Sequence, residues 1–320
     1  TFSPRGDLFV SRPRAGEILR LVDDDGDGYA EQLLMVASGL DKPHGLFFAN
    51  NDLLVAGETT LYRLLDAARL PLPEVKIVSN NLPDGGGHWT RSVVVDGQGR
   101  IYVSSGSSCN VCEEKDPRRG AVWRFAPGDG EGKLFASGLR NSVGLAFHPL
   151  SGELWGSDNG RDRLGDDLPP DEINLLRAGL DYGWPYCYGA KVPDPALGIP
   201  ERCATSESPQ VLLQAHSAPL GVTFGEGLVA SEPLRNSLLV AFHGSWNRTQ
   251  PTGYKLVSIP FSQDRPSGEV KDLVTGWLVD GNAWGRPVAL AIGPQGDLFV
   301  TDDRAGAVYR IIFPDEKRSP

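Results

Sequence analysis

Short apolar segments separated by tight turns recur along the whole chain. One unit appears six times, as an apolar strand, a turn rich in Gly, Asp or Asn, a second apolar strand, a gap and a third strand. The first copy reads TFSPRGDLFV followed by GEILRL, and the last reads PVALAIGPQGDLFV followed by GAVYRI. Short apolar runs bounded by such turn residues predict β-strands throughout the chain.

The spacing of the units indicates their arrangement. Their second strands carry the anchors Leu8, Leu53, Ile101, Leu154, Leu238 and Leu298, which lie 45, 48, 53, 84 and 60 positions apart. Regular β repeats of about 40–50 residues are typical of propeller blades. We therefore predict an all-β fold, a six-bladed β-propeller of four-stranded antiparallel blades, as one domain over residues 1–320. An irregular β-sandwich, the alternative, does not explain the repeated register.

Two places depart from the regular repeat. Thr1 begins inside the innermost strand of the first blade, so we expect that N-terminal strand to be incomplete and the last blade to have three strands. The wide spacing between the fourth and fifth copies indicates an insertion at about residues 186–214. We expect this insertion to lie between blades four and five and to shape a substrate entrance.

Composition agrees with this fold and excludes several classes of protein. The chain has 39 Gly, 25 Pro and one Met, which favours many short strands and turns over helices. A net charge of −10 without a basic cluster argues against a nucleic-acid partner. No apolar run approaches the ~20 residues of a membrane-spanning helix, and any leader peptide lies outside this sequence. Nucleophile elbow, P-loop and dinucleotide fingerprints are absent from the sequence, so hydride transfer to NAD is not expected.

Four cysteines give information about the compartment. Cys109 and Cys112 form a C-x-x-C, which is compatible with a redox pair, half a zinc site or a small disulfide. A second C-x-x-C, a nearby His cluster and a βαβ context are all missing, which disfavours zinc and thioredoxin-like chemistry. We favour disulfides Cys109–Cys112 and Cys187–Cys203 in a periplasmic or secreted protein, although sequence alone leaves the pairing open.

Polar residues stand directly before the innermost strands, which begin around a central channel in a propeller. They are His44, the segment His88–Arg91, Arg140–Asn141, His216–Ser217 and Arg286. Histidines and arginines from five blades predict a site for an anionic ligand. His88 is the candidate base for a bound hydroxyl, with Arg140 or Arg248 holding negative charge; the alternative is a hydrogen-bonded histidine at a blade entrance. His148 follows an inner strand and is expected to be structural.

Two acidic segments are candidate cation sites. Asp23, Asp25, Asp27 and Glu31 form D-x-D-G-D-G-x-x-E in the first blade, which predicts a structural calcium site, with a bare acidic turn as the alternative. The second segment, SDNGRDRLGDDLPPDE, contains Gly and Pro residues that exclude a helix. It is either a calcium loop or an acidic loop partly neutralised by Arg161 and Arg163. Its acidic residues are Asp158, Asp162, Asp166, Asp167, Asp171 and Glu172.

Four segments carry a family resemblance over all six blades. They are HWTRSVVVDGQGRIYVSSGSSCNVC, LRNSVGLAFHP, SDNGRDRLGDDLPPDEINLL followed by DYGWP, and HGSWNRTQPTGYKL. Together they resemble the pyrroloquinoline quinone (PQQ)-dependent sugar dehydrogenases, which include soluble glucose dehydrogenase and aldose sugar dehydrogenases, and above all the sorbosone dehydrogenase-like branch. The resemblance implies PQQ- and calcium-dependent oxidation of an aldose or related hydroxy-aldehyde to a lactone or acid. Electrons would pass to an external acceptor, a quinone or a cytochrome.

The resemblance also implies roles for individual residues. His88 matches the general base, which takes the proton of the anomeric hydroxyl while hydride passes to the quinone C5. Arg140 matches the arginine beside the quinone carbonyl, and backbone carbonyls of Gly160 and Arg161 match the calcium ligands, which would make the ion a Lewis acid. The expected cofactor-binding residues are His44, Arg91, Asn141, His216, His243, Arg248 and Arg286.

Two positions depart from the family pattern. The family has two arginines that clamp the cofactor carboxylates; Arg286 matches the first, and Val288 stands at the place of the second. Gly244 stands near the place of a lysine that binds the cofactor in the family. We therefore expect His216, His243 and Arg248 to restore positive charge for the cofactor carboxylates. A calcium-dependent propeller lactonase is the alternative enzyme, but it would place Glu, Asn and Asp ligands on the axis. A non-catalytic ligand-binding propeller is the third hypothesis.

Overall fold

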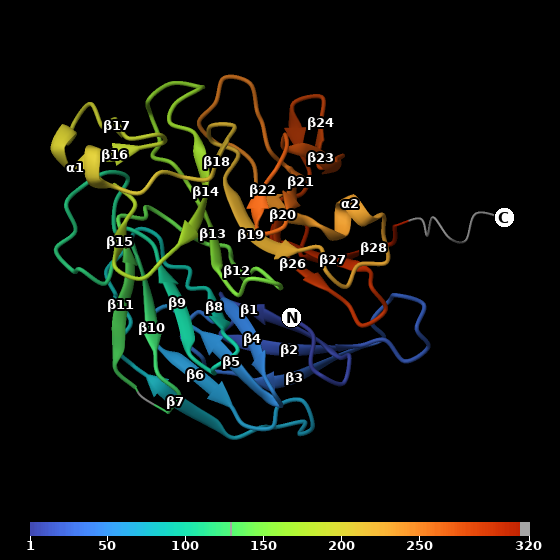
Figure 1. Cartoon of the computed structure of the whole chain (residues 1–320). Coiled ribbons are helices and arrows are strands. Elements are labelled where there is room, and N and C mark those ends of the chain that lie inside the picture. Colours follow the sequence, from blue (N-terminus) through green and yellow to red (C-terminus); the bar gives the residue numbers. More distant parts are fainter. Residues whose placement is uncertain (129, 314–320) are drawn as a thin grey trace.

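Six small β-sheets surround a common axis in the computed structural model, which describes residues 1–128 and 130–313 (Figure 1). The predicted six-bladed propeller is confirmed, and the strands within each blade pair antiparallel in chain order. Five of the six anchors lie in the second strand of their blade, and the sixth, Leu8, lies in β1, the first strand of the blade-one sheet. None of the helices in the described part of the chain is long and apolar enough to span a membrane.

Blades two to five each have at least four strands. Blade two contains β4 (Gly45–Ala49), β5 (Asp52–Ala56), β6 (Leu61–Leu64) and β7 (Val75–Ser79). Blade three contains β8 (Val93–Val95), β9 (Ile101–Ser105), β10 (Ala121–Phe125) and β11 (Gly132–Ser137). Blade four contains β12 (Leu145–Phe147), β13 (Leu154–Asp158), β14 (Asp171–Leu176) and β18 (Val211–Leu213). Blade five contains β19 (Pro219–Phe224), β20 (Ser237–Phe242), β21 (Lys255–Ser262) and β23 (Lys271–Val274), with β22 (Arg265–Pro266) also on β21.

Blades one and six have three strands each among the described residues. Blade one contains β1 (Leu8–Arg12), β2 (Glu17–Val22) and β3 (Gln32–Ala37); blade six contains β26 (Pro287–Ile292), β27 (Leu298–Asp302) and β28 (Ala307–Ile311). Residues at the start of the chain lie along β1, where Phe2 bridges Leu8 and the Phe9 amide donates to the Thr1 carbonyl at 2.8 Å. This short pairing stands in the place of the predicted incomplete inner strand.

The apolar core lies between neighbouring blades rather than at the axis. In β5, Leu53 and Val55 pack toward blade one, whereas Leu54 and Ala56 pack toward blade three. Successive strand residues point to opposite faces, and both faces of a blade are covered, so the strand reads as an unbroken apolar run. Similar clusters join blades three to four, four to five and five to six.

The insertion is placed differently from the prediction. It lies within blade four, because Val211–Leu213 returns to pair with β14 as the outermost strand. A three-residue strand after a long excursion has too little pattern to be recognised in the sequence. Before returning, the chain adds β15 (Leu180–Asp181) parallel to β11 of blade three. The insertion then forms the hairpin β16 (Cys187–Tyr188) and β17 (Val192–Pro193) and helix α1 (Pro200–Thr205).

Short elements outside the blades complete the chain. Helix α2 (Glu232–Arg235) precedes β20, and the hairpin β24 (Leu278–Val279) and β25 (Asn282–Ala283) precedes β26. Both expected disulfides are present, Cys109–Cys112 in the loop after β9 and Cys187–Cys203 between β16 and α1. The predicted pairing is therefore confirmed.

The position of the core yields a prediction about stability. Leu238 is fully buried between blades four and five. We expect Leu238→Ala to lower the free energy of unfolding by about 2–5 kcal/mol, because it leaves a cavity in a packed interior. Leu134→Ala is the control, since this leucine of β11 is 49% exposed. Urea unfolding of both variants tests the expectation, and equal losses would contradict the placement of the core.

Candidate functional site

The candidate base, His88, is held in one tautomer. Its Nδ1 lies 3.0 Å from Ser107 Oγ and 3.1 Å from the Ser107 carbonyl. The Ser107 hydroxyl donates its own hydrogen to the Cys109 carbonyl at 2.7 Å, so it accepts from His88, and a carbonyl only accepts. Both contacts place the ring proton on Nδ1. The lone pair of Nε2 has no partner among the residues that the structure describes.

The surroundings of His88 keep the imidazole neutral. Burial lowers its pKa to about 4, and the nearby Arg140, Arg119 and Arg91 add to this effect, while the bond to Ser107 opposes it. Positive neighbours disfavour a further positive charge on the ring. Above about pH 4, His88 is therefore a neutral imidazole whose Nε2 can accept a proton.

Two buried arginines support the backbone of His88 from behind. Arg91 Nη1 donates to the carbonyls of His88 and Thr90, both at 2.9 Å, and its Nη2 donates to the Pro83 carbonyl at 2.6 Å. Its side chain is fully buried, and this burial, with Arg119 nearby, lowers its pKa to about 10. Arg91 thus supports the loop in this structure, whereas the sequence suggested direct cofactor contact. Arg119 also donates to the His88 carbonyl, at 3.0 Å, and the sequence analysis missed it.

Arg140 uses every N–H of its guanidinium. Its Nε donates to the Asn110 carbonyl at 2.9 Å, and its Nη2 donates to Asn110 Oδ1 at 2.9 Å and Asp162 Oδ2 at 3.2 Å. Its Nη1 donates to the carbonyls of Asn159, at 3.1 Å, and Gly160, at 2.8 Å. The predicted arginine and a predicted calcium ligand are therefore in direct contact.

Asn141 lies close to His88, as the sequence predicted. A Cβ atom added to Gly106 would lie 2.5 Å from Asn141 Oδ1 and 2.6 Å from His88 Cβ, so both side chains converge on this glycine. The Asn141 side-chain amide has no hydrogen-bond partner within residues 1–128 and 130–313. It is free to bind a ligand beside the imidazole.

The acidic run does not form a solvated carboxylate cage. Asp158 accepts from the amides of Arg140 and Asn141 at 2.9 and 2.6 Å, and Asp171 accepts from those of Gly160 and Ala218 at 2.8 and 2.9 Å. Burial raises the pKa of Asp158 to about 6 and that of Asp171 to about 7. Burial also raises the pKa of Glu172 to about 8, with a contribution from Asp158. These carboxyl groups shape the loop through their hydrogen bonds to its backbone.

Arg161 and Gly160 present different groups to this loop. The Arg161 guanidinium binds both oxygens of Asp194 in the insertion, at 2.9 and 2.7 Å, so its side chain points to the insertion. The Gly160 carbonyl accepts one hydrogen bond, from Arg140, and the Arg161 carbonyl accepts none from the described residues. Both carbonyl oxygens retain a lone pair for a cation.

Two of the predicted cofactor residues hold the tip of the acidic loop. Arg248 Nη1 donates to the Asp166 carbonyl, and its Nη2 lies 3.3 Å from Asp167 Oδ1. His216 Nε2 donates to the Gly165 carbonyl at 2.9 Å, because a carbonyl can only accept. In this structure Arg248 and His216 therefore fasten the loop of blade four to the loop before β19 and to the loop between β20 and β21.

The remaining predicted residues join adjacent blades at the same end of the propeller. His243 Nε2 lies 3.0 Å from Asp303 Oδ1. Arg286 donates to the carbonyls of His243, at 3.1 Å, and Gly244, at 2.7 Å. His44 Nδ1 lies 3.0 Å from the Arg91 carbonyl, and burial lowers the pKa of its imidazole. His148 lies at the other end, where it packs against Phe224 and Phe261, as a structural residue would.

The acidic loop of blade one is separate from these residues. One ligand oxygen from each of Asp23, Asp25, Asp27 and Glu31 lies within 4.8 Å of the others, and all four side chains are exposed. Asp23 also accepts from the amides of Gly26 and Gly28, at 2.7 and 2.9 Å, as an acidic turn without metal would. Calcium binding at this loop stays a prediction.

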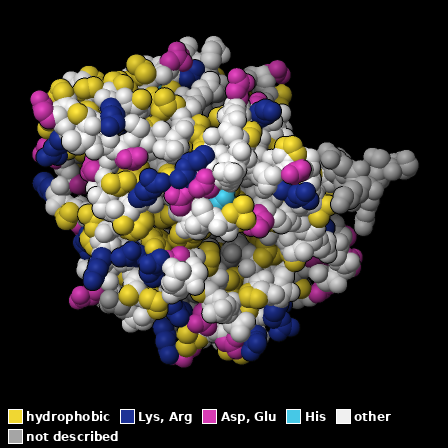
Figure 2. Space-filling model, viewed as in Figure 1, with side chains coloured by type: hydrophobic (Ala, Val, Ile, Leu, Met, Phe, Trp, Pro, Cys, Tyr) yellow, Lys and Arg dark blue, Asp and Glu magenta, His cyan; other side chains and the backbone are white. Residues whose placement is uncertain are grey.

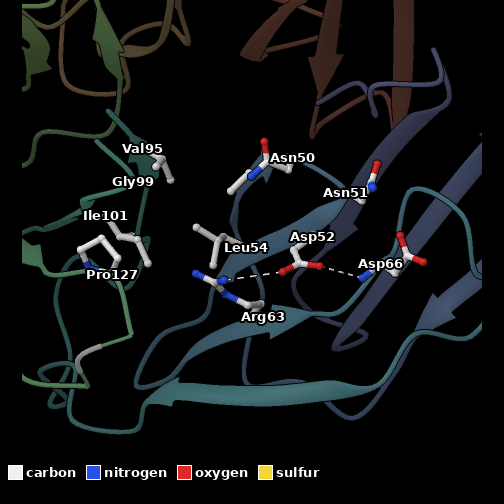
Figure 3. Close-up of a pocket in the computed structure, with 11 residues that line it drawn as sticks. Asn50, Asn51, Asp52, Leu54, Arg63, Asp66, Val95, Gly99, Ile101 and Pro127 are labelled. Atoms are coloured by element: carbon white, nitrogen blue, oxygen red, sulfur yellow. Dashed lines mark hydrogen bonds and ion pairs between the residues drawn. The ribbon is translucent and has the colours of Figure 1, made fainter. Parts of the chain in front are cut away.

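Two cavities lie near the opposite ends of the inner strands. One, of about 390 Å³, is lined by Asn50, Asn51, Asp52 and Arg63 between blades two and three (Figure 3). The other, of about 670 Å³, lies between blades three and four and includes His148 in its lining. Neither contains His88 or Arg140, so neither is the predicted site. The face shown in Figure 2 carries basic and acidic side chains beside a histidine near its centre.

The lowered pKa of His88 predicts a pH dependence of stability. Between pH 6.5 and about 4 the unfolded chain binds a proton at this residue and the folded chain does not, so stability falls as the pH is lowered. We expect the free energy of unfolding of His88→Gln to fall by about 3 kcal/mol less than that of the wild type when the pH is lowered from 7 to 4. Urea unfolding at both pH values measures this difference, and parallel losses would contradict the assignment.

The contacts of Arg248 predict a change in loop dynamics. We expect Arg248→Ala to speed amide hydrogen exchange in residues 163–168 by about tenfold or more, because it removes about 1.4 kcal/mol or more of protection against opening. Arg69→Ala is the control, since this arginine is exposed and pairs only weakly with Asp66, at 3.9 Å. Unchanged exchange in the acidic loop would show that Arg248 does not hold it.

Comparisons with known proteins found relatives in sequence and in fold. An uncharacterized protein of Borreliella burgdorferi is 31% identical in an alignment of 299 positions that covers 88% of this chain and 78% of that protein. The pyrroloquinoline quinone-dependent pyranose dehydrogenase of Coprinopsis cinerea is 29% identical in an alignment of 233 positions that covers 56% of this chain and 31% of that protein. The chain therefore spans about a third of the length of that dehydrogenase.

A solved structure and two family profiles also match this chain. The calcium structure of a Trichoderma reesei enzyme of carbohydrate-active family AA12 has a TM-score of 0.82 at 22% identity, covering 97% of this chain and 91% of that one. A TrAA12-like profile matches residues 199–312. The profile described as Glucose / Sorbosone dehydrogenase matches residues 49–245, which include His88, Arg140 and Gly160. The chain belongs to the glucose/sorbosone dehydrogenase family of oxidoreductases.

Proposed function

We propose that this protein is a PQQ- and calcium-dependent dehydrogenase that oxidises an aldose or a related, sorbosone-like hydroxy-aldehyde to a lactone or acid. The observation that carries the proposal is the neutral imidazole of His88. Its tautomer is fixed by Ser107, and its Nε2 lone pair has no partner among the described residues. Asn141 lies beside it, and the positive charge of Arg140 is close enough to lower its pKa. The name of the Coprinopsis cinerea relative and the calcium structure from Trichoderma reesei support the choice of cofactors.

The charges around His88 suit an anionic cofactor. Arg91, Arg119 and Arg140 all act on the imidazole as positive neighbours. Two nitrogens of Arg119, Nε and Nη2, are buried without a hydrogen-bond partner among the described residues. PQQ has three carboxylates, which such a field would stabilise.

The acidic loop suits a hard dication. Calcium prefers oxygen ligands, and the free lone pairs of the Gly160 and Arg161 carbonyls would supply two of them. The buried Asp158 and Asp171 hold the loop and would stabilise positive charge there. Calcium held by these carbonyls would supply Lewis-acid catalysis, and PQQ held beside it would supply the acceptor for hydride.

The chain itself supplies the proton transfer. His88 Nε2 takes the proton of the hydroxyl that is being oxidised, while Ser107 keeps Nδ1 protonated. The low pKa of His88, about 4, favours rapid return of that proton to solvent. Electrons then pass to an external acceptor, a quinone or a cytochrome. Two disulfides favour a periplasmic or secreted protein.

A calcium-dependent lactonase is the second candidate. It would need carboxylate or amide side chains free to bind a metal at the channel. Asp158 and Asp171 instead accept backbone hydrogen bonds, and only the Asn141 amide among the residues described above is free. The proposal of a dehydrogenase therefore agrees better with the donors that the site offers.

One reconstitution experiment separates the hypotheses. PQQ and calcium are added to the apo-protein, and sugars are titrated with an artificial electron acceptor. We expect a quinone absorbance band, dye reduction that needs both additions, and a loss of about 10²–10⁴-fold in kcat/KM for His88→Ala. Asn50→Ala, at the opposite end of the propeller, is the control and is expected to keep full activity.

The other outcomes identify the alternatives. Full dye reduction by His88→Ala would refute the assignment of the base. Lactone hydrolysis with calcium alone would favour the lactonase. If neither dye reduction nor lactone hydrolysis is observed, the result would favour a non-catalytic ligand-binding propeller.

A further inference from the structure

Asn110 joins the disulfide loop of blade three to the two parts of the site in blade four. Its carbonyl and its Oδ1 both accept from Arg140, at 2.9 Å each. Its Oδ1 also accepts from the Asp162 amide at 2.8 Å, and its Nδ2 donates to the Asp162 carbonyl at 3.1 Å. One asparagine thus fixes a guanidinium 30 positions away and a backbone segment 52 positions away.

The contact with Arg140 determines where a buried positive charge lies. Arg140 is 5% exposed, and Asn110 binds two of the five N–H groups on its guanidinium. The guanidinium is rigid and planar, so fixing Nε and Nη2 also fixes the direction of Nη1. Nη1 is the group that contacts the carbonyls of Asn159 and Gly160.

The contact with Asp162 orients the loop that carries the two carbonyls. The side-chain amide of Asn110 binds both the N–H and the C=O of Asp162, as a neighbouring strand would. Asp162 directly follows Arg161, so this pairing restrains the peptide group that would present a ligand oxygen. Aspartate lacks the donor and alanine lacks both groups, so an amide of this length is specifically required.

We propose that Asn110 is a positioning residue. It holds Arg140 and the carbonyls of Gly160 and Arg161 in the orientation needed to bind a divalent cation and a ligand that contacts both this cation and Arg140. The inference rests on the function proposed above. The Cys109–Cys112 disulfide encloses Asn110 in a short loop and limits its freedom. Ser107 binds the Cys109 carbonyl, so the same loop orients His88.

The test uses Asn110→Ala in the whole protein, in a background of Asp25→Asn and Asp27→Asn that removes the other candidate cation loop. Calcium affinity is measured by calorimetry without cofactor, and kcat and KM are measured after reconstitution. We expect calcium affinity and kcat each to fall by about 10–100-fold, the usual effect of removing a residue that orients metal ligands. If this variant does not fold, Asn110→Ser replaces it with the same expectations.

Asn81→Ala is a matched control. Asn81 also binds one arginine, Arg118, through both its carbonyl and its Oδ1, but it does not contact Arg140 or the acidic loop. We expect calcium affinity and kcat within about twofold of the wild type for this variant, because ligand orientation is retained. Equal effects of Asn110→Ala and Asn81→Ala would overturn the inference.

The readouts distinguish the two proposals. A wild type that binds calcium but reduces no dye would refute the dehydrogenase and still allow Asn110 to be tested by calorimetry. A background protein that binds no calcium would overturn the positioning role itself. An active wild type with an unaffected Asn110→Ala variant would refute only the inference.

Discussion

The site depends on the hydrogen bonds that the buried guanidinium of Arg140 donates. All five of its N–H groups are used, and their acceptors come from the loop of blade three and the loop of blade four. Burying a cation is costly unless its hydrogen bonds are satisfied, so these acceptors and the arginine require one another. Loss of any one partner would leave either a buried charge or a polar loop without its organising group.

Arg140 also lies at a boundary between two electrostatic regions. On the side of blade three, Arg91 and Arg119 surround His88 with positive charge. On the side of blade four, burial raises the pKa of Asp158, Asp171 and Glu172, and Asp158 adds to this effect at Asp171 and Glu172. A site with both signs of potential can hold an anion and a dication next to each other, whereas either region alone would repel one of them.

The sequence predicted what depends on local pattern. Short apolar runs such as Leu53–Ala56, bounded by turn residues, located the strands. The position of His88 and Arg140 before inner strands located the end of the ring where they meet. The sequence did not reveal the directions in which long side chains point. Arg91, Arg248 and His216 were predicted as cofactor-binding residues, yet in the structure they bind backbone carbonyls. Ser107, Asn110 and Arg119 were missed because their partners lie 19 to 52 positions away and no local pattern marks them.

The insertion crosses from blade four to the edge of blade three before it returns. There, β15 pairs with β11, and the Glu207 amide donates to the Asp181 carbonyl at 2.7 Å. The Arg161 guanidinium binds the Asp194 carboxylate in the insertion, and the Cys187–Cys203 disulfide joins β16 to α1. These contacts tie the long connection within blade four to the edge of blade three. Separating blades three and four at this edge would have to break backbone pairing, so the long connection also limits how far the ring can open there.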